Sequence, residues 1–223
     1  MDTTTHHSPR HALPAVVLIG AGLSSVLVMT FHPTAHGADI QTRLRSLAEI
    51  SPLSLHVHMA MIGFIVALWC SLAYIARQWP TSGWVWLATR LYAIGASAML
   101  GAALISGFLV GAYLARMAPG VFTADDALPS VLLAFSANQV LAGFGTIFLS
   151  LAIALWSVEL VRSPGRLSRV CGYYGIAAGG LCIAAYAARL LSMNVTGMTA
   201  VVAAHGAWYC LLGLWALRGR TPD

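Results

Sequence analysis

Five histidines are the side chains of this sequence best suited to chemistry, because a neutral imidazole binds haem iron, copper or zinc. His32 and His36 follow the first long apolar run, and His56 and His58 open the second. His205 lies about eight residues into the last apolar run. A polar side chain is costly in lipid and usually faces other helices. The five histidines therefore predict a site inside a helix bundle or at its surface.

The spacing of these histidines favours one pair. His56 and His58 are two residues apart and point to different sides of a helix. We predict that His58, the deeper of the two, binds a cofactor together with His205, which requires their two helices to be neighbours. The thioether of Met61 would suit Cu(I). The remaining metal-ligand candidates, nearer the surface, are His32, His36, His56 and Met61.

Polar side chains in two other apolar runs lie at a similar level. Arg189, near the outer end of the fifth run, could hold a carboxylate such as a haem propionate. Asn138 and Gln139 lie in the outer half of the fourth run. We expect at least one of the three to point into the bundle, because an unsatisfied amide in hydrocarbon costs several kcal/mol. The alternatives are simple hydrogen bonds between helices and, for Arg189, snorkelling to the interface.

Six long apolar runs must position these residues. The chain of 223 residues is 59% hydrophobic and 9% charged, against roughly 25% charged in a soluble domain. Each run is long enough to cross a ~30 Å hydrocarbon layer as a helix. The sequence therefore predicts an all-α polytopic transmembrane bundle, with spans at 13–31, 53–76, 85–114, 128–160, 170–193 and 197–217. The third and fourth spans exceed the required length and should tilt or protrude, and 37–52 is the longest loop.

The arginines predict orientation, because basic residues gather in cytoplasmic loops. Most of them lie on the side that carries both chain ends. We expect cytoplasmic tails at 1–12 and 218–223 around a transmembrane domain at 13–217, in a bacterial inner membrane. The expected partners are the lipid bilayer and other membrane subunits. The net charge of +5 does not indicate nucleic-acid binding, since the arginines lie at the ends of apolar runs.

Glycines at four-residue spacing predict close contacts between helices. Gly107 and Gly111 share the third span, and Gly175 and Gly179 share the fifth. Such small residues let helix backbones approach each other in a membrane. The pattern predicts a compact bundle and favours no particular function.

The segment LHVHMAMIGF, from Leu55 to Phe64, resembles a known pattern. It is similar to the H-x-H-x-x-x-x-G-[FW] segment of small membrane proteins related to haem-copper oxidase subunit I, and to one in the haem- and copper-containing NnrS family. The likeness continues to Pro80. In the oxidases a histidine at the start of the second helix binds a low-spin haem, and His56 or His58 matches that position. The chain has about half the helices of that subunit and lacks the histidines of its oxygen-reducing centre, so the resemblance does not imply oxygen reduction.

These patterns favour a protein that binds haem b or copper and serves in electron transfer or as a respiratory accessory protein. The alternative is a cofactor-free structural or accessory subunit that packs through its glycine faces. A solute or metal carrier is a third hypothesis, which the lack of carboxylates deep inside the spans disfavours. No P-loop, G-x-S-x-G, H-E-x-x-H or C-x-x-C-H motif is present, so the sequence leaves enzymatic activity open.

Overall fold

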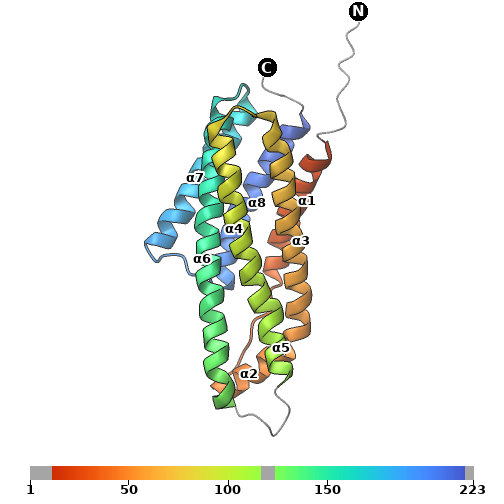
Figure 1. Ribbon diagram of the computed structural model, residues 1–223, viewed down its shortest axis with the longest axis vertical. Coiled ribbons are helices and arrows are strands. Elements are labelled where there is room, and N and C mark those ends of the chain that lie inside the picture. Colours follow the sequence, from red (N-terminus) through yellow and green to blue (C-terminus); the bar gives the residue numbers. More distant parts are fainter. Residues whose placement is uncertain (1–11, 117–123, 219–223) are drawn as a thin grey trace, which may run out of the picture.

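The computed structural model describes residues 12–116 and 124–218, and the regular structure within these ranges is helical (Figure 1). Six helical units are long and apolar enough to cross a membrane, which confirms the predicted all-α bundle. Of the two predicted tails, only Ala12 and Arg218 fall within the described residues. The elements in chain order are α1 (Ala12–Thr30), α2 (Ile40–Glu49), α3 (Ser51–Ile75), η2 (Ala76–Gln78), α4 (Gly83–Leu104), η3 (Ile105–Leu109), α5 (Val110–Ala115), α6 (Ala124–Arg162), α7 (Arg166–Ala187) and α8 (Val195–Leu217).

The helices differ in length, and this shapes one end of the bundle. At 1.5 Å per residue, the 19 residues of α1 span about 28 Å and the 23 of α8 about 35 Å, close to a ~30 Å hydrocarbon layer. The 39 residues of α6 span about 58 Å. Figure 1 shows α6, α3 and the continuous helix α4–η3–α5 extending past the ends of α1, α7 and α8. The third and fourth spans are thus longer than most of the bundle, as predicted, and the second span extends with them.

The short helix α2 lies at this protruding end, opposite the first residues of α1 and the last of α8 (Figure 1). The sequence prediction of a plain loop at 37–52 was wrong. Asp39 caps the helix by accepting a hydrogen bond from the Thr42 backbone N–H at 2.8 Å. Leu44 turns inward and packs against Val110 and Leu114. A local cap and one apolar face thus make a helix out of a largely polar segment.

The fifth span is shorter than predicted, because α7 ends at Ala187. Arg189 adopts a positive φ of 58°, and the backbone N–H groups of Leu190 and Leu191 both bond to the carbonyl of Ala185. This left-handed residue closes the helix in the manner of a C-terminal cap. Hydropathy alone predicts a span that continues to residue 193, because the turn after α7 is itself apolar.

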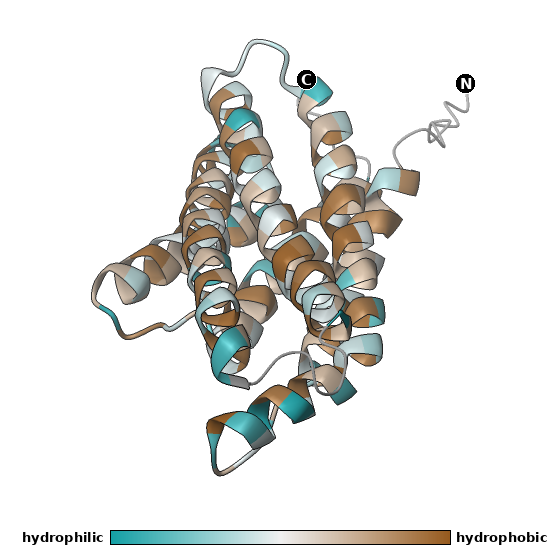
Figure 2. Ribbon diagram, turned by 60° about the horizontal axis from the view of Figure 1, so that its bottom comes forward, coloured by the Kyte–Doolittle hydropathy of each residue, from teal (hydrophilic) through white to brown (hydrophobic). Residues whose placement is uncertain are grey.

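The core is apolar, and so is much of the outer surface. α1 packs between α3 and α8, while α6 packs along both α4 and α7. Buried leucines and tryptophans fill the centre, among them Leu18, Leu72, Trp156 and Leu212. Figure 2 shows hydrophobic residues along the outsides of the helices and hydrophilic residues concentrated at α2 and the turns. A large exposed apolar surface of this kind fits lipid contact.

The four predicted glycines do lie at close helix contacts. A Cβ on Gly111 would overlap the Oγ of Ser51, and one on Gly179 would lie 2.4 Å from the carbonyl oxygen of Ser150. A Cβ on Gly175 would likewise overlap a side chain of α6. Gly107 lies directly against His58, where a Cβ would be 2.3 Å from the Cβ of the histidine. The small-residue prediction is therefore confirmed, and one of its positions belongs to the site described next.

Candidate functional site

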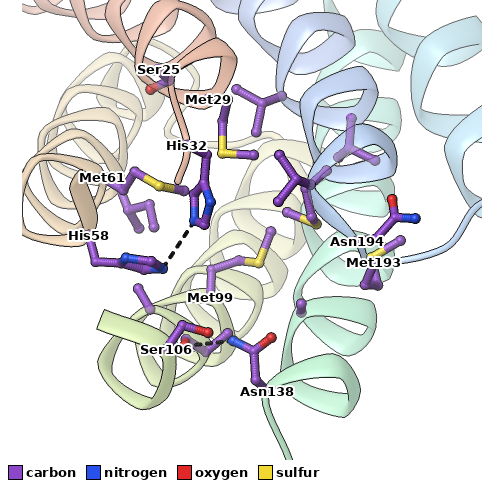
Figure 3. A pocket seen from close by; sticks show the side chains of 18 of the residues that line it. Ser25, Met29, His32, His58, Met61, Met99, Ser106, Asn138, Met193 and Asn194 are labelled. Atoms are coloured by element: carbon purple, nitrogen blue, oxygen red, sulfur yellow. Dashed lines mark hydrogen bonds between the residues drawn. The ribbon is translucent and has the colours of Figure 1, made fainter. Parts of the chain in front are cut away.

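A cavity of about 370 Å³ lies among α1, α3, α4, α6 and α8. Figure 3 shows His32 and His58 at one end of it, with Met29 and Met61 nearby. His205 and the pair Tyr92 and Tyr209 border it farther along the bundle. The tyrosine hydroxyl groups are 2.9 Å apart, and the buried indole of Trp208 lies beyond Tyr209. The cavity thus runs from the level at which α1 ends into the interior.

His58 is fixed by its own helix and by a neighbouring one. Its Nδ1 lies 2.7 Å from the carbonyl oxygen of Ser54, one turn earlier in α3. A carbonyl can only accept, so Nδ1 carries the proton and Nε2 presents a lone pair. Gly107 closes over the other side of the ring, within the π-helical turn η3. Such turns are frequent at functional sites. Only 4% of the His58 surface is exposed.

His32 approaches from the segment that follows α1. Its Nδ1 lies 3.0 Å from the carbonyl oxygen of Pro33, so its Nε2 also presents a lone pair. Burial lowers the pKa of His32 below the ordinary value, although the bond to Pro33 partly opposes this shift. His32 is therefore neutral at pH 7 and free to accept a cation.

The two Nε2 atoms face each other at 3.4 Å, with the ring planes at 78° (Figure 3). Since each Nδ1 already carries the proton, no proton lies between them in the neutral state. Two lone pairs that face each other repel, and a cation placed between them would bind both. Donation of Nδ1–H to a carbonyl is also the usual arrangement behind metal-binding histidines.

Thioethers are the softest further ligands that the cavity lining offers near the histidine pair. Within residues 12–116 and 124–218, no three His, Cys, Asp or Glu side chains are grouped so that they could hold a metal ion. The cavity lining supplies Met29 and Met61 beside the histidine pair. The residues therefore fit a soft metal with a preference for sulfur and imidazole ligands better than they fit Zn²⁺ or Mg²⁺.

His58 and His205 border the same cavity but do not pair as predicted. The expectation that their helices are neighbours was wrong, because α3 and α8 each pack along α1. His205 borders the same cavity, but its Nε2 is hydrogen-bonded to the Ser150 hydroxyl at 3.0 Å. His32 is the residue that pairs with His58.

Three further predicted ligands lie outside the cavity. Arg189 is exposed in the turn after α7 and is not part of the cavity lining. His36 is exposed, with its Nε2 3.2 Å from the Thr34 hydroxyl. His56 is exposed as well, and its Nδ1 donates to the Pro52 carbonyl at 2.7 Å. The prediction that His56 and His58 point different ways is thereby confirmed. His56 does not form one site with His32 and His36.

The amide prediction is confirmed. Asn138 donates to the carbonyl of Ala102 at 2.8 Å, and Gln139 donates to that of Met193 at 3.0 Å. Both residues border the cavity. Sequence reasoning missed most of the methionine lining, although five of the six methionines in the described residues contribute to it. No periodic signal in any single span points to them, because they come from α1, α3, α4, α8 and the turn before α8.

Comparisons with known proteins identify no relative of this chain. No family model matches the chain, and no match is found among curated proteins or solved structures. The function is therefore inferred from the cavity and its side chains.

Proposed function

We propose that this multi-pass membrane protein binds copper, as Cu(I), through His32 and His58 with a thioether from Met29 or Met61. The observation that carries the proposal is the pair of Nε2 atoms that face each other at 3.4 Å at the end of the cavity, while each Nδ1 lies against a carbonyl oxygen. Cu(I) is a soft ion that accepts imidazole and thioether ligands, and it needs no carboxylate or thiolate.

Haem b is the other cofactor that the histidines suggest. Two axial imidazoles on opposite faces of a haem iron would place their nitrogens about 4 Å apart, at about 2 Å from the metal on each side. The 3.4 Å separation is shorter than this and fits one small ion better than a haem iron. The sulfur-containing lining also favours copper.

Copper undergoes one-electron chemistry, which suits a role in electron transfer or as a respiratory accessory protein. The resemblance of the segment around His58 to haem-copper oxidases agrees with this role. The arginine distribution supports a bacterial inner membrane with both chain ends in the cytoplasm. In that orientation the histidine pair lies at the outer surface, where copper reaches it without crossing the bilayer.

A cofactor-free subunit is the competing function, and one observation favours it. A single extra proton shared between the two Nε2 atoms would also remove the repulsion, and each Nδ1 is already satisfied by a carbonyl. In that case the histidines would only join the end of α1 to α3.

Cu(I) titration in mild detergent, against a chromophoric Cu(I) chelator, separates these functions. His58→Ala should weaken binding strongly, whereas the matched control His56→Ala, two residues away and exposed, should not. The background sequence carries His6→Gln, His7→Gln and His11→Gln, so that these histidines, which lie outside the described ranges, contribute nothing to the titration. Equal Cu(I) affinity in both variants would overturn the proposal and favour the cofactor-free subunit.

A further inference from the structure

The methionines of this chain are concentrated around the cavity. Of the six methionines in the described residues, five border it, namely Met29, Met61, Met99, Met193 and Met198. Methionine often fills gaps in apolar cores, but this role does not require the residues to gather around one space. Only Met29 and Met61 lie at the histidine end and enter the copper site proposed above (Figure 3). Three methionines remain without a function.

These three residues come together from separate elements. Met99 belongs to α4, Met193 to the turn before α8, and Met198 to the first turns of α8. Met193 forms a buried cluster with Ala102 and Ala142, against which Met99 and Met198 also pack. Three methionine side chains from separate elements are therefore brought to one part of the cavity wall.

The sulfur atoms of two of them have defined surroundings. A Cβ at position 145 of α6 would lie 2.8 Å from the Sδ of Met99, so only glycine at this position leaves room for the sulfur. The Sδ of Met193 accepts a hydrogen bond from the Thr146 hydroxyl at 3.4 Å. A thioether sulfur has a second lone pair, which this bond leaves free. Figure 3 shows Met99 extending from α4 into the cavity.

Thioethers without other ligands select strongly among metals. They are neutral and soft, so they bind Cu(I) and not Mg²⁺, Ca²⁺ or Zn²⁺. Among the described residues that border the cavity there is no carboxylate and no cysteine. Because no anion balances the charge of a bound ion, and burying an unpaired charge is costly, binding at the cluster should be weak.

We propose that Met99, Met193 and Met198 form a second, all-thioether site for Cu(I) in the same cavity, to which an ion held by His32 and His58 can transfer. The proposal rests on the proposed copper function for the identity of the ion. The transfer moves Cu(I) from one ligand set to the other without change of oxidation state. The cavity would then be a two-position path for copper, with one position at the histidines and a weak one at the methionines.

Anaerobic Cu(I) titration combined with copper K-edge X-ray absorption tests this. In the background that lacks His6, His7 and His11, we expect the unaltered cavity to bind two equivalents. The variant with Met99→Leu, Met193→Leu and Met198→Leu should bind one equivalent with nitrogen in its shell. Leucine replaces methionine with little change of volume, so the fold should survive, as the melting temperature of the variant would confirm.

The complementary variant carries His32→Ala and His58→Ala. It should retain one weakly bound equivalent with sulfur alone in its shell. Met59→Leu, at a methionine that is 46% exposed, serves as the control and should keep both equivalents. A second equivalent that persists in the triple leucine variant would overturn the methionine site. Unchanged binding in the double alanine variant would instead overturn the histidine site, so the two failures are distinguishable.

Discussion

Gly107→Ala should damage the histidine site without touching a ligand. The added Cβ would lie 2.3 Å from the Cβ of His58 and 2.6 Å from its Cγ. Both atoms are close to the backbone of α3, so rotation of the imidazole cannot relieve the overlap. Either the helices separate at η3 or the His58 ring moves away from His32.

The size of the effect follows from this overlap. Overpacking by one methyl group costs about 1–3 kcal/mol, and the helix preference of alanine over glycine returns up to about 1 kcal/mol. We therefore expect a net loss in unfolding free energy of about 0–3 kcal/mol. If displacement of His58 absorbs the strain, a cost of about 1–3 kcal/mol in the bound state weakens Cu(I) binding by about 5- to 150-fold.

The control for this variant is Gly63→Ala, also in a membrane-spanning helix. A Cβ at Gly63 would meet nothing within 4 Å, so copper affinity should not change and stability should rise slightly. The assay is Cu(I) competition titration together with the thermal midpoint of each variant in detergent. Equal copper affinity and equal stability for the Gly107 and Gly63 variants would refute the close contact between η3 and His58.

Three further predictions follow from the same structure. Burial lowers the pKa of His32, so below pH 6.5 the unfolded chain binds more protons than the folded chain. The thermal midpoint of the metal-free protein should therefore fall as the pH drops from 6.5 toward the lowered pKa. His32→Asn should reduce this dependence of the midpoint on pH. Ser150→Ala should leave buried His205 without its hydrogen-bond partner and cost about 1–3 kcal/mol of stability. The copper affinity should stay unchanged, because His205 is not a proposed ligand. A large drop in copper affinity would instead make His205 part of the site. In a cysteine-free background, Ala48→Cys on α2 should react with a membrane-impermeant maleimide on intact cells, whereas Pro164→Cys between α6 and α7 should not. The opposite labelling pattern would reverse the proposed orientation.

The spans were predictable because their signals are local. A run of apolar residues fixes where a membrane helix can form, and the ends were displaced only where capping intervened. Arg189 illustrates this, since its left-handed conformation ends α7 within a stretch that is still hydrophobic. Asp39 illustrates the opposite case, where a cap begins a helix that hydropathy does not indicate.

The histidine pairing was not predictable from spacing. The positions of His58 and His205 along their helices gave similar depths, but depth does not determine which helices are neighbours. The place of α1 between α3 and α8 separates that pair, and the chain leaving α1 brings His32 to His58. The methionine cluster has the same cause, because contacts among α4, α8 and the turn before α8 create it. Such contacts between distant segments leave no periodic trace in a sequence.

The central claim is that the facing histidines hold copper. The visible absorption spectrum and the metal content of the protein, produced with copper in the growth medium and purified in mild detergent, test it most directly. The account predicts at least one copper ion per chain and no Soret band, with the copper content lowered by His58→Ala and kept by His56→Ala. A Soret band would assign the histidines to haem b, and an absence of both copper and haem would contradict the claim altogether.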